Sequence, residues 1–278
     1  MRGNRHSNAV ASNRREALHL LKEWPGIEGR VRRAGRVALF TDFDGTLTPI
    51  RPHPQQVHLP PTVRAALQAL AQRGTTVGVI SGRSLADVRA RVGLRGIWYV
   101  GAHGYFLRSP ENRTAALLRP DQMALMSSVH RQLRAQIGFL PGIRIESKQA
   151  TVAVHYRQAS SHSRRQARPV IRGLLRKHPK LTLLSGKKVW ELLPESRVSK
   201  WTAIEHILRL ERARRGGRWL VFYLGDDTTD ERVFESMRGA RINGISIVVG
   251  KRRSAAQFFL RSPAEAASFL EKLCGALR

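Results

Sequence analysis

Two carboxylates close together in the chain are the first residues with a spacing suited to chemistry. Asp42 and Asp44 stand in the segment DFDGTL at residues 42–47, which Thr41 joins to the apolar run 37–40. Carboxylates two residues apart normally point to opposite faces of a strand. At a strand end, however, Gly45 permits a sharp turn that can bring both to one site. One carboxylate can then act as a nucleophile and the other as a general acid and base.

A second acidic segment, GDDTTD at residues 225–230, follows the apolar run 219–224. Several carboxylates without basic neighbours repel one another, and a divalent cation removes that repulsion. Hard oxygen ligands favour magnesium over zinc. We therefore predict a Mg²⁺ site whose ligands are Asp42, Asp44, Asp226 and Asp227.

Hydroxyl and basic groups could bind a phosphate beside these acids. Ser81, Gly82 and Arg83 follow the apolar run 75–80, where a hydroxyl and backbone amides can surround an anion. Lys200 stands at the start of a predicted helix and could neutralise a phosphoryl oxygen. As a set these residues indicate phosphoryl transfer. Asp42 would attack phosphorus, Asp44 would protonate the leaving alcohol, and the remaining oxygens would be bound by Thr46, Ser81 and Lys200.

The elements that carry these residues alternate between strand and helix. We expect strands at 37–40, 75–80, 97–100, 219–224 and 246–249, with helices at 62–72, 85–92, 200–212, 230–238 and 263–277. This alternation predicts an α/β fold with a doubly wound parallel sheet. Because ligands of such sheets bind at the carboxyl ends of the strands, the acidic segments and Ser81 should meet there.

A different pattern interrupts the alternation. It predicts a helix at 120–137, a hairpin from 142–147 and 150–156, a basic helix at 163–177, and strands at 181–184 and 188–193. We therefore predict an inserted α+β cap domain at 116–195 and a core formed by 31–115 and 196–278. The amphipathic run 16–24 suggests that residues 1–30 form a helical N-terminal extension.

Composition narrows the function classes. The net charge of +29 raises a nucleic-acid hypothesis, but the Lys and Arg residues are scattered and no base-stacking aromatic cluster accompanies them. A solvated, arginine-rich surface is the favoured interpretation. No apolar run is long enough for a transmembrane helix, and the N-terminus lacks the apolar stretch of a secretory signal. We expect a cytoplasmic monomer without a membrane partner. Cys274 has no second cysteine with which to form a disulfide.

Taken in order, these motifs resemble those of the haloacid dehalogenase superfamily, and within it the trehalose-6-phosphate phosphatase family. The resemblance rests on TDFDGTLTPI at 41–50, SGR at 81–83, His103 before Gly104, and GDDTTDE at 225–231. It implies a Rossmann-like core with a cap. It also implies a Mg²⁺-dependent enzyme that hydrolyses trehalose 6-phosphate to trehalose and phosphate through an aspartyl-phosphate intermediate.

The resemblance extends to the cap. It implies that Glu146, Lys148 and Glu191 bind glucose hydroxyls, with Arg157 or Lys188 near the phosphate. The family usually has an arginine before the proline that follows this glutamate, where this chain has Leu193. For His103 we expect a hydrogen bond to a backbone carbonyl rather than a contact with substrate.

Two other functions stay open. A phosphatase of the same fold could act on mannosyl-3-phosphoglycerate or sucrose phosphate, because these enzymes would share the catalytic residues. A nucleic-acid-binding protein could also use a phosphatase scaffold. The intact set of Asp42, Asp44, Lys200 and Asp226 argues against the second alternative.

Overall fold

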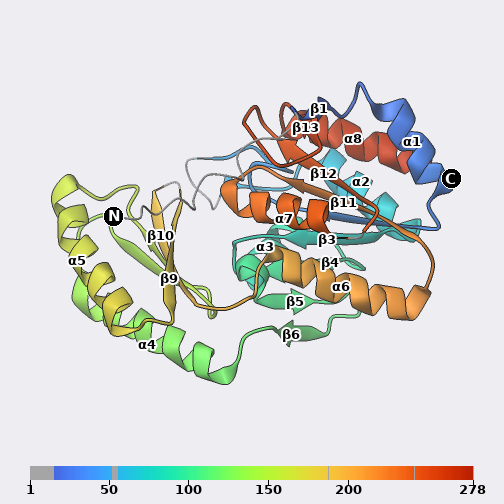
Figure 1. The fold of residues 1–278 in the computed structure, drawn as a ribbon. Coiled ribbons are helices and arrows are strands. Elements are labelled where there is room, and N and C mark those ends of the chain that lie inside the picture. Colours follow the sequence, from blue (N-terminus) through green and yellow to red (C-terminus); the bar gives the residue numbers. More distant parts are fainter. Residues whose placement is uncertain (1–15, 52–55, 187, 241, 278) are drawn as a thin grey trace, which may run out of the picture.

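The computed structural model describes residues 16–51, 56–186, 188–240 and 242–277, and their main feature is a large sheet (Figure 1). Within these ranges the sheet has nine strands in the order β1-β13-β12-β11-β2-β3-β4-β5-β6. Neighbours from β1 to β4 are parallel, whereas β5 and β6 add an antiparallel edge. The strands are β1 (Leu18–His19), β2 (Arg36–Thr41), β3 (Thr76–Ile80), β4 (Trp98–Gly101), β5 (Phe106–Arg108), β6 (Thr114–Ala116), β11 (Trp219–Gly225), β12 (Gly244–Val249) and β13 (Phe258–Leu260).

Helices cover both faces of this sheet, which confirms the predicted doubly wound fold. One apolar core lies under α1 (Trp24–Arg33), α2 (Pro61–Gln72), α3 (Leu85–Val92) and α8 (Pro263–Ala276). The opposite core lies under α6 (Lys200–Arg215) and α7 (Thr228–Gly239). Because both faces are covered, the central strands are continuous apolar runs, and every residue of β11 is buried.

A second, antiparallel sheet lies beside the first, in the order β7-β8-β10-β9. Its strands are β7 (Arg144–Ser147), β8 (Val152–His155), β9 (Leu181–Gly186) and β10 (Val189–Pro194). The helices α4 (Pro120–Ile137) and α5 (Ser161–Lys177) pack on one face of it and enclose a separate apolar core. In Figure 1 both helices lie on the side of this sheet that is turned away from the main sheet. All of these elements fall within 116–195, and we propose that this unit is the cap domain.

The N-terminal segment differs from its prediction. Residues 1–15 lie outside the described residues, and the helix expected at 16–24 is not formed there. Instead β1 pairs with β13, and the first helix begins at Trp24 with a proline in its first turn. Trp24, Ile27 and Val31 are buried in the main core, so this helix belongs to the core fold rather than to an extension.

Among the residues that the structure describes, no helix is both long enough and apolar enough to cross a bilayer.

Candidate active site

The carboxyl ends of three adjacent strands form the site. Asp42 follows β2, Ser81 follows β3 and Asp226 follows β11, and these strands are neighbours in the sheet. The backbone N–H of Asp42 still donates to the carbonyl of Leu224 at 2.8 Å, which fixes the residue at the strand end. The parallel sheet therefore brings together motifs that lie far apart in the sequence.

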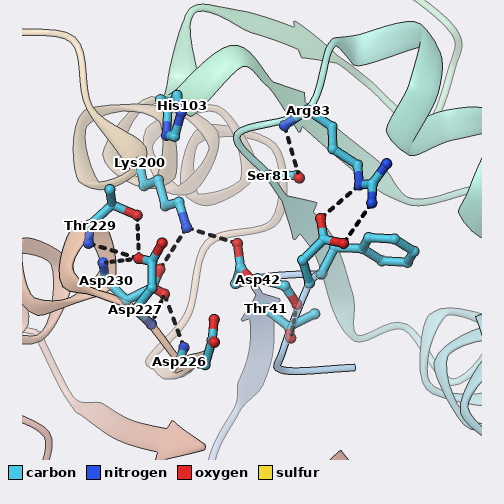
Figure 2. Close-up of polar contacts among 12 residues, drawn as sticks. Thr41, Asp42, Ser81, Arg83, His103, Lys200, Asp226, Asp227, Thr229 and Asp230 are labelled. Atoms are coloured by element: carbon cyan, nitrogen blue, oxygen red, sulfur yellow. Dashed lines mark hydrogen bonds and ion pairs between the residues drawn. The ribbon is translucent and has the colours of Figure 1, made fainter. Parts of the chain in front are cut away.

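Lys200 joins two buried carboxylates at the centre of the site (Figure 2). Its Nζ donates to Asp42 Oδ1 at 2.8 Å and to Asp230 Oδ1 at 2.7 Å. The lysine stands at the start of α6, where the hydroxyl of Ser199 caps the helix by accepting from the N–H of Thr202. The predicted meeting of Lys200 with the DFDGTL segment is present in the structure.

Burial and neighbouring charges have opposite effects on the pKa values of Asp42 and Lys200. Burial raises the pKa of Asp42 well above its usual range, and the charge of Lys200 opposes that effect. Burial alone would lower the pKa of Lys200, but Asp230 and Asp42 raise it well above its ordinary value. The ammonium therefore stays protonated at neutral pH and favours the ionised form of Asp42.

Asp230 shapes the acidic loop, a role that the sequence interpretation missed. Its Oδ2 accepts from the N–H groups of Asp226 and Asp227, each at 3.0 Å. Its Oδ1 accepts from Lys200 and, at 2.5 Å, from the hydroxyl of Tyr223. A side chain at Gly225 would collide with this carboxylate, since a Cβ there would lie 2.3 Å from Asp230 Cγ. Four donors occupy Asp230, so it acts as a scaffold for the loop.

A cluster of carboxylates fits a small divalent cation. Single oxygens of Asp42, Asp226 and Asp230 lie within 4.8 Å of one another. Because Asp230 is occupied by four donors, Asp42 and Asp226 are the proposed metal ligands. Gly45 makes their approach possible: it has a φ of +85°, and a Cβ there would lie 2.2 Å from Asp226 Oδ2. A cation between these acids would relieve their repulsion.

The carboxylates of Asp44 and Asp227, also predicted as metal ligands, lie outside this cluster. Asp44 accepts two hydrogen bonds from Arg83, from Nε at 2.6 Å and from Nη2 at 2.7 Å. Asp227 caps α7 and accepts from the N–H and hydroxyl of Thr229 at 2.7 and 2.6 Å. We therefore retain only a general acid and base role for Asp44.

The predicted phosphate-binding residues fall into two groups. Ser81, Gly82 and Arg83 line the cavity next to Asp42, but Arg83 is bound to Asp44 and, through Nη1 at 2.7 Å, to Asp87. Arg83 thus holds the proposed general acid. Thr46 is fully buried away from this cavity, and its hydroxyl has no hydrogen-bond partner among the described residues.

A cavity of about 280 Å³ lies between the cap and the core. Residues from both units line it. The predicted site residues among them are Asp42, Asp44, Ser81, Gly82, Arg83, Glu146, Lys148, Arg157, Glu191, Lys200 and Asp227. The walls are mostly charged, which suits a polar, anionic ligand.

Glu191 is the buried centre of the cap side of this cavity. It accepts from Lys148 Nζ at 2.9 Å and from the hydroxyl of Thr151 at 2.6 Å. Its second oxygen lies 3.2 Å from His103 Nε2, so the expectation that His103 binds a backbone carbonyl is wrong. Burial alone would raise the pKa of Glu191, but His103 and Lys148 hold it far below its usual value. The carboxylate is therefore ionised and available to accept hydrogen bonds.

The same network links the cap to the core. Lys148 Nζ also donates to the carbonyl of Gly82 at 2.9 Å, directly beside Ser81. Gly82 in turn lies against the ring of His103, since a Cβ on it would be 2.5 Å from His103 Cε1. A ligand bound between the two units would therefore be contacted by cap and core together.

Of the other cap residues predicted to bind substrate, two line the cavity and one does not. Glu146 lines the cavity and lies 2.8 Å from His155 Nε2, and that hydrogen bond lowers the pKa of Glu146. Arg157 lines it as well. Lys188 does not line it; this residue lies in the turn before β10, where its carbonyl accepts from the N–H of Tyr156 at 3.0 Å.

Comparison with known proteins decides the family. Residues 40–264 match the sequence model of the trehalose-phosphatase family. The chain belongs to this family. A trehalose-phosphate phosphatase of Mycolicibacterium paratuberculosis is 39% identical over 255 residues, which cover 88% of this chain and 64% of that protein. The chain thus spans somewhat less than two thirds of such relatives. The predicted family resemblance is confirmed.

Solved structures of other proteins support the fold. The C-terminal domain of trehalose-6-phosphate phosphatase from Candida albicans matches with a TM-score of 0.76 at 21% identity, covering 94% of this chain and 98% of that one. A haloacid dehalogenase-like hydrolase from Bacteroides thetaiotaomicron matches with a TM-score of 0.61 at 14% identity, over 85% and 98%. The predicted haloacid dehalogenase fold is therefore confirmed.

Proposed function

We propose that this protein hydrolyses trehalose 6-phosphate to trehalose and phosphate. The observation that carries this proposal is one cavity in which core residues for phosphoryl transfer meet charged cap residues that could bind a sugar. Family membership narrows the substrate class to phosphorylated trehalose. The cytoplasmic location and the monomeric state remain predictions.

The proposed reaction has two steps at Asp42. Its carboxylate oxygen attacks phosphorus, the bond from phosphorus to the sugar oxygen breaks, and Asp44 gives that oxygen a proton. Asp44 then takes a proton from a water molecule that attacks the aspartyl phosphate, which releases phosphate and restores Asp42. Lys200 holds Asp42 in place throughout. When bound by Asp42 and Asp226, Mg²⁺ would withdraw negative charge from the phosphoryl oxygens.

Arg83 would position Asp44 in this scheme. Two hydrogen bonds fix the carboxylate of Asp44, and the guanidinium is itself held by Asp87. The two hydrogen bonds hold the carboxylate of Asp44 at the cavity, where the second step needs it as a base. For the first step the carboxyl must carry a proton, so we infer that Asp44 turns from Arg83 toward the leaving oxygen.

A substrate panel tests the proposal. Purified protein is assayed with Mg²⁺ for phosphate release from trehalose 6-phosphate, sucrose 6-phosphate, mannosyl-3-phosphoglycerate and glucose 6-phosphate. We expect kcat/KM for trehalose 6-phosphate to exceed the others by at least about a hundredfold, because a site built to bind several hydroxyls rejects sugars that leave its groups unpaired. A preference for sucrose phosphate or mannosyl-3-phosphoglycerate would retain the chemistry and reject the substrate.

Metal removal is expected to stop the reaction reversibly. Excess EDTA should lower the rate by at least about a hundredfold, since the oxygens of Asp42 and Asp226 would lose the cation that offsets phosphoryl charge. Adding Mg²⁺ in excess of EDTA should restore the rate, and this recovery would show that EDTA did not damage the protein irreversibly. Full activity in excess chelator would refute the metal assignment.

Glu191→Gln is expected to weaken substrate binding more than the chemical step. The amide keeps the shape but loses the charge that holds Lys148 and faces the cavity. We expect KM for trehalose 6-phosphate to rise by about tenfold or more, with a smaller change in kcat. Asp121→Asn is the matched control, because Asp121 is an exposed cap acid on α4. Equal kinetics in the two variants would contradict a sugar-binding role for Glu191.

A further inference from the structure

The cap contains a long segment without negative charge. Between Glu146 and Glu191 the sequence has no Asp or Glu and eleven Lys or Arg residues. Helix α5 lies in the middle of this segment. Lys and Arg residues occur along the whole chain, but in this segment no acidic residue offsets them, so its net positive charge is high.

Four arginines of α5 form a stripe on one side of the helix. Arg165, Arg168, Arg172 and Arg176 are spaced by three, four and four residues, so successive side chains lie on the same face. All four are exposed. With a rise of about 1.5 Å per residue, the stripe is about 16 Å long. We call these residues the α5 arginine stripe.

The stripe faces away from the active site. The opposite side of α5 buries Ala167, Ile171 and Leu174 in the cap core, and this core separates the helix from the cavity. Figure 1 shows α5 on the outer surface of the cap. The stripe therefore takes no part in the proposed hydrolysis.

Acidic side chains do not neutralise the stripe. Among the described residues, none of its four arginines is engaged in an ion pair. On the neighbouring helix α4 the acid Asp121 is bound by Arg119, and Glu146 and Glu191 lie at the cavity. Arg131 and Arg134 of α4 are exposed as well and add to the positive charge of the two cap helices.

We propose that the α5 arginine stripe binds the phosphate backbone of duplex DNA without reading its sequence. Duplex DNA carries about one negative charge per 1.7 Å, so a stripe of this length spans several phosphates. Guanidinium groups bind phosphate oxygens through paired hydrogen bonds. The charge complementarity of an acid-free helix and a dense polyanion carries the proposal.

Other polyanions fit the helix less well. A helix that binds at a membrane surface must bury its apolar face in lipid, but the apolar face of α5 is packed in the cap core. Single-stranded nucleic acid is bound through aromatic side chains that stack on bases, and α5 contains no Phe, Tyr or Trp. Duplex DNA needs neither feature.

Charge reversal on the stripe tests the proposal. Arg165, Arg172 and Arg176 are changed to Glu together, and Arg168 is left in place because it lies over the ring of Trp190. The control reverses Arg95, Arg212 and Arg218, which are exposed on the core and change the net charge equally. Binding of the full-length protein to a short labelled DNA duplex is measured by fluorescence anisotropy at several salt concentrations.

We expect the stripe variant to lose at least about a hundredfold in affinity, and the slope of log K against log salt to become shallower by about 2 to 3. The control should lose less than about tenfold. Equal losses in the two variants, or no measurable binding by the unchanged protein, would overturn the proposal. So would tighter binding to anionic vesicles or to single strands than to the duplex.

Hydrolysis and thermal unfolding show whether the stripe variant is still folded and active. Hydrolysis of the sugar phosphate and the thermal unfolding midpoint should be unchanged in the stripe variant, because the three replaced arginines do not line the cavity and Arg168, which lies over Trp190 of the cap core, is kept. If the variant fails to fold, the neutral replacements Arg165→Gln, Arg172→Gln and Arg176→Gln should still lower DNA affinity by about tenfold or more. Retained affinity in the folded neutral variant would equally overturn the proposal.

Discussion

Asp42→Asn should reduce phosphate release by at least about a thousandfold while the protein remains folded. The amide has the shape of the carboxylate but cannot attack phosphorus, and it is also a weaker ligand for Mg²⁺ than the carboxylate. Lys200 keeps Asp230 as its partner in the variant, and we expect little loss of stability. Steady-state phosphate release and thermal unfolding of both proteins measure the two effects.

The outcome separates catalysis from folding. A variant that unfolds at the wild-type temperature and has lost its activity supports a role for Asp42 in the reaction rather than in folding. A folded variant with the wild-type rate would reject the mechanism, because no other carboxylate in the cluster both lines the cavity and contacts Lys200. Asp121→Asn again provides the control for an acid-to-amide change at an exposed position.

Lys200→Met is expected to impair both activity and stability. The lysine is 4% exposed and lies between Asp42 and Asp230, so its loss leaves two buried carboxylates without their shared cation. Removing one partner of a buried ion pair typically costs about 3 to 5 kcal/mol. We expect a loss of that size in the free energy of unfolding and a decrease in rate of at least about a hundredfold.

Denaturant unfolding and phosphate release measure the two effects. Lys272→Met is the matched control, because Lys272 is exposed on α8 and its loss should change stability by less than about 0.5 kcal/mol. If the free energy of unfolding of Lys200→Met lies within about 1 kcal/mol of that of the control, the ion pairs of Lys200 do not stabilise the fold as proposed.

The central strands and most helices were predictable because their physical signals are local. Strands buried on both faces are continuous apolar runs, as β2, β3 and β11 show. Helix α3 has the predicted bounds, since the hydroxyl of Ser84 caps its start and Gly93 ends it in the left-handed region. Such signals need no knowledge of the tertiary structure.

The short strands near the two edges of the sheet could not be predicted in this way. β1, β5, β6 and β13 contain two or three residues each, which is too few to show a period. They form because a neighbouring strand offers hydrogen bonds. At the N-terminus, Pro25 was the usable signal, because proline favours the first turn of a helix and places the start of α1 near Trp24.

Within the site, the sequence indicated which residues converge but not how they pair. That Asp44 binds Arg83, and that Asp230 joins Lys200 to the acidic loop, depends on side-chain positions that spacing does not specify. One local signal for Asp230 existed: it is the third residue of α7, where an acid can complete the capping of a helix start. The contact between His103 and Glu191 joins core and cap and had no local signal.

Direct detection of a phosphoryl group on Asp42 is the sharpest test of the account. The protein is mixed with trehalose 6-phosphate and Mg²⁺, quenched in acid within a single turnover, and reduced with borohydride, which converts an acyl phosphate to an alcohol. Peptide mass spectrometry should then find the modified side chain at residue 42, and only when substrate was present. Turnover of the sugar phosphate without modification of Asp42, or with modification of another residue, would contradict the account.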